Sequence, residues 1–411
     1  MSKKMPSLYK NIISLTFVQL ITYLSPIIVL PYLSRVLELE FFGLTMIIMS
    51  IIIMSLLITD FGFNLYTPAW IAENKGNTKK VSDKISAIFI LKIALYLPTS
   101  IVIILYFYLS DIPNDIKESL CIVTLIAILF QAFQIPWFFQ GIERMLNITL
   151  LTFLSKVSYV FFIFLSVNEQ HDILAVIISY AASNLITTIM SVILYYKLGY
   201  SLTICSSLPL METLKNSFPF FVSRASVSIY TSASTMIIGS TSGLTQAALY
   251  SSAEKLYQAG QSISYPISQA LYPYLARTKS ILTFYKFIII LTPFLIGFIT
   301  IIYSYSNEII ILFYGNEYAQ SSNVLKVFLI TTVVNFISVN FGYPAFSIIN
   351  RLDIANKSVI YAGILQAFIL FCLYLNSGIT AINVAISILI VESFVMLVRI
   401  FYFVKISRGL K

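Results

Sequence analysis

Ionisable side chains lie inside long apolar stretches of this chain, where a charge is costly unless it contacts water or a partner. Arg224 lies ten residues past the start of one stretch, about 15 Å deep at the rise of an α-helix and beyond the reach of a side chain that bends back to the surface. A charge at the centre of such a helix costs roughly 2.5–3.5 kcal/mol on insertion scales. The position predicts that Arg224 lines a wet cavity and contacts a ligand, with a structural ion pair as the alternative.

The next apolar stretch contains a second polar group. Glu254 and Lys255 are neighbours in sequence, and adjacent helical residues do not face each other, so we expect no pair between them. Each then needs another partner or water. Further polar side chains in the same two stretches are Tyr230, Tyr257, Gln258 and Gln261.

Buried lysines and acids elsewhere could either bind a ligand or pair with one another. Lys92 and Lys156 each lie about 12 Å from the nearer helix end, and both ligand contact and pairing between helices stay open for them. A buried carboxylate favours its neutral form unless it is paired. Asp60, Glu254 and Glu392 are therefore candidates for coupling to protons or cations, and static pairing with the lysines is the alternative.

Twelve apolar stretches must hold these side chains, and a bilayer requires such stretches to be helical. Each approaches the ~20 residues that cross the hydrocarbon core, and the chain is 58% hydrophobic and 10% charged. The predicted spans are residues 11–34, 42–70, 84–109, 119–139, 148–167, 173–196, 214–238, 247–275, 284–305, 324–349, 358–375 and 380–404. Arg399 lies near the end of the last span, where bending toward the surface explains its charge.

Basic residues are distributed unequally between the two sets of connections. The connections on the side of the N-terminus, together with the span ends that adjoin them, hold eighteen Lys and Arg residues, and those on the other side hold only Arg35 and Lys117. This bias predicts that both termini lie in the cytoplasm. The basic residues that give the chain its net charge of +9 would then lie beside membrane lipids. This placement disfavours a nucleic-acid partner.

The two halves contain a faint repeat. Pro136-Trp137-Phe138 near the end of the fourth span matches Pro344-Ala345-Phe346 near the end of the tenth, and an arginine follows each. Six spans per half would relate the halves by an axis along the membrane normal, with a cavity between them. We predict an N-terminal lobe at 1–196, a cytoplasmic linker at 197–213 and a C-terminal lobe at 214–411.

Several function classes are disfavoured by what the connections lack. None exceeds about 20 residues, too few for a soluble domain, and none contains a GxxxxGK[ST] phosphate loop. A single histidine and three scattered cysteines predict neither histidine catalysis nor a metal cluster. The expected protein is an all-α polytopic membrane protein without an enzymatic site or resident cofactor.

Two motifs resemble a known family. Pro136-Trp137-Phe138-Phe139-Gln140-Gly141 resembles the P-W-F-F-Q-G signature of Wzx-type O-antigen flippases, in the polysaccharide transporter branch of the MOP superfamily. The stretch from Ala248 to Leu256 is similar to that family's A-x-Y-x-x-A-E-K-L motif. The resemblance implies twelve helices in two six-helix lobes around a central cationic cavity, as in MATE transporters. It also implies transfer of an undecaprenyl-diphosphate-linked oligosaccharide (O-antigen or capsule repeat unit) across the bacterial inner membrane.

In that frame the phosphates would contact Arg224 and Lys255, and the sugars would contact tyrosine and glutamine side chains of the same two spans. A proton or sodium gradient would drive rocking of the lobes. A polysaccharide polymerase and a chain-length regulator are expected partners. The alternatives are a small-molecule antiporter of the same superfamily, whose cavity would be richer in acids, and a membrane polysaccharide polymerase, which would need a large external loop.

Overall fold

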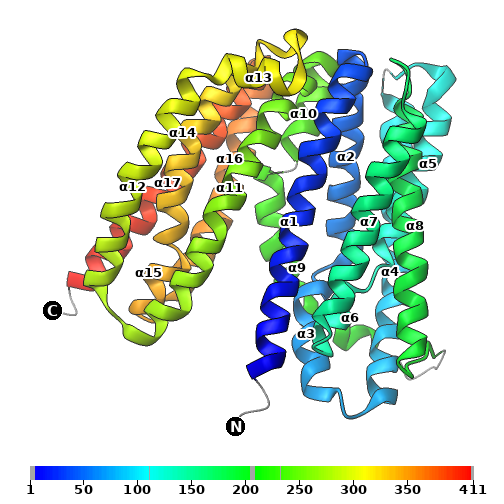
Figure 1. Ribbon diagram of the computed structural model, residues 1–411, viewed down its shortest axis with the longest axis horizontal. Helices are drawn as coiled ribbons and strands as arrows, with labels where there is room; N and C mark the ends of the chain where they lie inside the picture. The colour runs from blue at the N-terminus through cyan, green and yellow to red at the C-terminus, as the bar shows by residue number, and fades with distance from the viewer. Residues whose placement is uncertain (1–4, 111, 204–208, 232, 409–411) are drawn as a thin grey trace. The chain divides into compact units, whose positions relative to one another are not determined.

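The computed structural model describes residues 5–110, 112–203, 209–231 and 233–408 (Figure 1). Over these residues the protein consists of helices and short connections, with no β-strand. The helices of the N-terminal half are α1 (Met5–Val36), α2 (Leu39–Asp60), α3 (Phe63–Asn74), α4 (Thr78–Leu109), α5 (Asn114–Ala132), α6 (Pro136–Gly141), α7 (Met145–Ser166), α8 (Ile173–Lys197) and α9 (Leu210–Thr231). Those that follow are α10 (Ala233–Ser242), α11 (Leu244–Thr278), α12 (Ile281–Ser304), α13 (Ser306–Tyr314), the 3₁₀ helix η1 (Asn316–Tyr318), α14 (Ser321–Asn340), α15 (Tyr343–Ile348), α16 (Leu352–Leu375) and α17 (Ala381–Arg408).

Each predicted span coincides with one helix or with two helices separated by a break. Within the described residues, nine segments are long and apolar enough to cross a membrane. The other three predicted spans correspond to α1, to α9 with α10, and to α11. The all-helical membrane fold is confirmed, and the count of twelve crossings stays a prediction.

The chain forms two compact units. The first contains residues 1–41 and 48–225, and the second contains residues 42–47 and 226–411. The first part of α9 thus packs with the N-terminal helices, and the start of α2 packs with the C-terminal ones. The predicted division into lobes at 197–213 stays a prediction.

A break between α2 and α3 brings α9 against the first unit. Phe61 and Gly62 both have positive φ, 41° and 80°, and end α2. A Cβ atom at Gly62 would lie 2.7 Å from the carbonyl oxygen of Ser217 and 2.8 Å from the amide nitrogen of Phe221. Only glycine fits this close approach, and the ring of Phe61 stacks on that of Phe221 at 4.6 Å between centroids.

The proline motifs that suggested a repeat form the same local structure in both units. Each motif makes a six-residue helix, α6 or α15, with proline in its first turn. A residue with left-handed φ follows, Glu143 at 62° and Asn350 at 55°. The next amide, of Arg144 or Arg351, then donates back to the carbonyl five residues earlier, at 2.8 and 3.0 Å. Shared geometry at matching positions supports an internal repeat.

Aromatic residues of the same motif form the core of the first unit. Phe138 is buried and lies edge-on to three rings, those of Phe139, Tyr195 and Tyr200, at 4.9–5.1 Å between centroids. Around it α5, α7 and α8 pack side by side (Figure 1). In the second unit α14 packs against α11, α12 and α17, and α17 packs against α16. These two helix groups position the polar side chains of the two units.

Candidate functional site

Lys92 joins three helix ends inside the first unit. Its Nζ atom lies 3.1 Å from Oδ1 of Asp60, the last residue of α2, and donates at 2.7 Å to the carbonyl of Ala132, the last residue of α5. The ring of Trp137 on α6 lies 5.9 Å away. Lys92 is 2% exposed, so this charge is compensated almost entirely by protein. The structure therefore brings the predicted ligand-binding Lys92 and the predicted coupling residue Asp60 into one pair.

A second buried lysine was not among the predicted site residues. Lys84 is 0% exposed and lies over the rings of Trp70 and Tyr66, at 4.9 and 5.4 Å from Nζ to the centroids. Its Nζ also lies 3.2 Å from Oε1 of Glu212 on α9, while Asn216 on α9 donates to the Tyr66 hydroxyl at 3.0 Å. These contacts hold α9 on α3 and α4. The aromatic residues one turn apart, Tyr66 and Trp70, were the available sequence signal.

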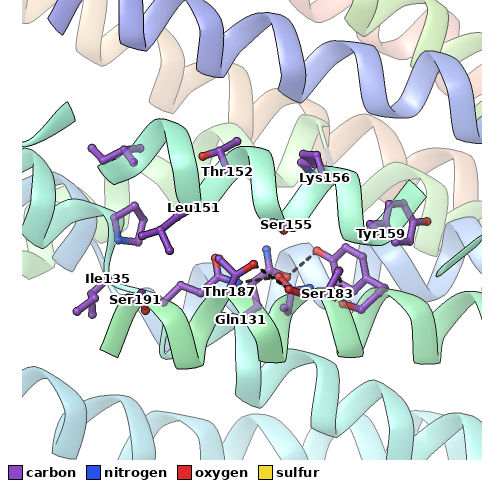
Figure 2. Close-up of a pocket in the computed structure, with 15 residues that line it drawn as sticks. Gln131, Ile135, Leu151, Thr152, Ser155, Lys156, Tyr159, Ser183, Thr187 and Ser191 are labelled. Carbon is purple, nitrogen blue, oxygen red and sulfur yellow. Dashed lines mark hydrogen bonds between the residues drawn. The ribbon is translucent and has the colours of Figure 1, made fainter. Parts of the chain in front are cut away.

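A cavity lined by both polar and apolar side chains lies within the first unit, between α5, α7 and α8 (Figure 2). Its volume is about 170 Å³. Figure 2 shows Thr152, Ser155, Lys156 and Tyr159 along α7, opposite Ser183, Thr187 and Ser191 on α8. Gln131 and Gln134 contribute from α5 and from the break that follows it. The predicted ligand-binding residue Lys156 therefore lines a cavity of the first unit.

Comparison with known proteins identifies the family of this chain. The model of the family described as "Polysaccharide biosynthesis protein" matches residues 8–279. The chain belongs to this family. Over 277 residues it is 30% identical to proteins of Shigella dysenteriae and Escherichia coli K12, each named "Putative O-antigen transporter". These alignments cover 66% of this chain and 68% and 66% of the two relatives.

Solved structures share the fold of this family member. The lipid II flippase MurJ, in an inward closed conformation, superposes with a TM-score of 0.68 over 97% of this chain and 90% of its own, at 13% identity. A MOP superfamily transporter of Pyrococcus furiosus gives 0.60 over 98% and 96%, at 15% identity. A MATE transporter of Vibrio cholerae gives 0.56 over 98% and 97%, at 16% identity. The protein therefore has the MOP superfamily fold, as the motifs predicted.

In the second unit, Glu254 and Lys255 on α11 do not pair with each other, although the Gln258 side chain contacts both of them. Glu254 is 6% exposed, and its Oε2 accepts from the hydroxyl of Thr235 on α10 at 3.3 Å. Lys255 is only partly buried, and its Nζ donates to Oε1 of Gln258 at 3.4 Å. Gln261 donates to the Tyr257 hydroxyl at 2.6 Å. No ion pair joins Glu254 to Lys255, which confirms the expectation for adjacent helical residues.

Glu392 and Arg399 are both buried in the second unit, each 7% exposed. Arg399 on α17 donates to the Ser358 hydroxyl at 2.9 Å and to the Ser338 carbonyl at 2.8 Å. These contacts join α14, α16 and α17. The expectation that Arg399 bends toward the surface was wrong, because neighbouring helices supply its acceptors inside the protein.

Arg224 lies on the part of α9 that belongs to the first unit. Its side chain is exposed, and it forms no hydrogen bond or ion pair with any residue that the structure describes. The side chain of Tyr230 lies outside the described residues. Lys255, Tyr257, Gln258 and Gln261 belong to the second unit. Ligand contact by these residues stays a prediction.

Proposed function

We propose that this protein is a flippase, which moves an undecaprenyl-diphosphate-linked oligosaccharide across the bacterial inner membrane by alternating access. Membership of the polysaccharide biosynthesis family carries the proposal, and two relatives named as O-antigen transporters support it. The MOP fold is shared with a protein described as a lipid II flippase. Both termini would lie in the cytoplasm, where the basic connections contact anionic lipids.

The chemistry of the side chains fits this cargo. Sugar hydroxyls and phosphates lose several kcal/mol each when they leave water without partners. Arg224 presents an exposed guanidinium on α9, and Lys255, Tyr257 and Gln261 present an ammonium, a hydroxyl and an amide on α11. We assign the diphosphate to Arg224 and Lys255, because cations bind phosphate oxygens through charge-assisted hydrogen bonds.

Glu254 is the residue that we assign to coupling with a proton or sodium gradient. Asp60 already pairs with Lys92. Glu254 and Glu392 each lie near a cation, Lys255 and Arg399, but only Glu254 is on α11 beside the lysine that we assign to the diphosphate. Glu254 is buried with a hydroxyl contact and no ion pair among the described residues. A carboxylate in that setting gains most from binding a proton or a cation.

Reconstitution in liposomes tests the transport function. The purified protein is placed in vesicles that hold an undecaprenyl-diphosphate-linked oligosaccharide in both leaflets, and an enzyme added outside measures the fraction that becomes accessible. We expect wild-type protein to expose the inner pool, and Arg224→Ala to slow this by about tenfold or more, the loss of one strong charged contact. Vesicles that move organic cations but leave the oligosaccharide in place would support the antiporter alternative.

A polymerase and a chain-length regulator would act after the flippase, on the outer face of the membrane. Co-purification of either protein with the intact transporter would support this assembly. Transport by the isolated protein at the full cellular rate would show that neither is needed for the crossing step.

A further inference from the structure

Lys156 lies at the middle of α7 and has no partner among the residues that the structure describes. It is the twelfth residue of this 22-residue helix, about 15 Å from either end at the helical rise. Its Nζ atom forms no hydrogen bond or ion pair with any described residue. A lysine at that depth cannot reach the surface with its four-carbon stem. Among the described residues nothing compensates a charge on Lys156, and the adjoining cavity can hold the water or the anion that would do so.

The opposite wall of the cavity is held in place by its own hydrogen bonds. The Tyr180 hydroxyl donates to Oε1 of Gln131 at 2.6 Å, and Nε2 of Gln134 donates to Oδ1 of Asn184 at 2.8 Å. Asn184 also donates to the Tyr180 carbonyl at 2.9 Å. These bonds connect α8 to the end of α5, so the wall is formed before a ligand arrives.

The wall on α7 has unused hydrogen-bonding capacity beside the lysine. Thr152 and Ser155 line the cavity at positions four and one residues before Lys156. Their hydroxyl groups form no hydrogen bond with any described residue, and both side chains are only partly buried. No Asp or Glu is among the residues that line the cavity. The cavity thus offers one positive charge, two free hydroxyls and a fixed polar wall.

Size and aromatic surface narrow the class of ligand. A cavity of about 150 Å³ accommodates one benzene ring, so a cavity of 170 Å³ can hold at most one six-membered ring and excludes a longer oligosaccharide. The rings of Tyr159 and Tyr180 meet edge to face at 5.7 Å and provide the flat apolar surface on which the C–H face of a sugar packs. Eleven of the fifteen lining residues carry a hydroxyl, amide or ammonium group, and the other four are apolar. This mixture suits a saccharide, which has hydroxyls around its ring and apolar C–H faces.

We propose that this cavity binds an acidic sugar, a single ring that carries one carboxylate, with the carboxylate on Lys156 and the ring hydroxyls on Thr152, Ser155 and the amide wall. The inference rests on the proposed function and specifies its cargo. A single lysine balances one carboxylate. A diphosphate carries more charge and would leave part of it uncompensated in the interior, so the cavity favours the sugar over the lipid headgroup.

A paired transport assay tests the site. Two undecaprenyl-diphosphate-linked disaccharides that differ only in the terminal sugar, glucuronate or glucose, are compared in liposomes with wild type, K156Q and K156R. We expect K156Q to slow the acidic cargo about tenfold relative to the neutral one, as the loss of one charge-assisted hydrogen bond predicts. K156R should keep the preference because it keeps the charge. The matched control K326Q, which removes a lysine near Tyr303 on another helix, should behave as wild type.

Equal slowing of both cargoes by K156Q would overturn the proposal, because it would show a structural role or contact with the diphosphate. A binding measurement keeps the site testable even if wild-type protein moves neither cargo and the flippase function fails. Saturation-transfer NMR on the purified full chain should detect glucuronate with wild type and lose that signal with K156Q, while glucose binds weakly to both. Binding of glucuronate that K156Q leaves unchanged, or that inorganic phosphate displaces equally well, would refute an acidic-sugar site.

Discussion

Replacing Lys92 with methionine tests whether the Lys92–Asp60 pair stabilises the fold or serves transport. The substitution keeps the length of the side chain and removes the ammonium group. It would leave the Asp60 carboxylate without its cation, 3.1 Å away in the wild type, and the Ala132 carbonyl without its donor. Both lost contacts lie at helix ends, those of α2 and α5.

The expected decrease in the free energy of unfolding follows from the burial of Lys92 and Asp60. Removing one member of a buried ion pair costs about 3–5 kcal/mol. The Asp60 side chain is 20% exposed, so water partly solvates the orphaned carboxylate and we expect about 3 kcal/mol, at the low end of that range. In the double variant K92M/D60N neither side chain carries a charge, so no buried charge lacks a partner. Only the Ala132 carbonyl lacks its hydrogen-bond donor in this variant, which should lower the free energy of unfolding by about 1 kcal/mol.

Reversible unfolding in bicelles would measure these free energies, and the liposome assay would measure transport by the same variants. A double variant that is stable and active would show that the pair is structural. A double variant that is stable but inactive would show that Lys92 or Asp60 acts on the cargo or the coupling ion. If K92M alone proves as stable as wild type, the structural reasoning about this pair is refuted. K326M serves as the control for removing a lysine from a helix.

Two further predictions concern the α2–α3 break and the coupling residue. Gly62→Ala should lower the free energy of unfolding by about 3 kcal/mol, because backbone strain at positive φ costs ~1 kcal/mol or more and the new Cβ collides with α9. The matched control Gly199→Ala, at φ 81° with nothing within 4 Å, should show the strain alone, and equal losses in the two variants would contradict a close approach of α9. Glu254→Gln should abolish the acceleration of transport by a pH or sodium gradient while transport without a gradient continues, and an unchanged gradient response in liposomes would exclude Glu254 from coupling.

Much of the helical framework could be predicted because it depends on local composition. Long apolar runs marked the helices, and Pro136 marked the start of α6. Gly62 lies inside the predicted span 42–70, where its positive φ and that of Phe61 end α2. These features depend on residues close together in the sequence.

The pairing of ionisable groups could not be predicted to the same extent. Lys92 and Asp60 were both identified as buried, but the rotation of α4 and α2 about their axes decides that they meet. Lys84 is the first residue of the predicted span 84–109, and nothing local shows that Glu212 and two aromatic rings cover it. The burial of Arg399 likewise depends on hydrogen bonds to Ser338 and Ser358, which precede it by 61 and 41 residues.

The way the two compact units divide the chain affects how the polypeptide can be split. Residues 42–47 belong to the second unit, and residues 210–225 belong to the first. A chain opened between Thr203 and Pro209 would therefore give two fragments, neither of which contains all of its own unit. Each fragment would need a segment from the other to complete its core. The two halves therefore depend on each other during synthesis and assembly, even though the proline motifs of α6 and α15 have the same local structure in both.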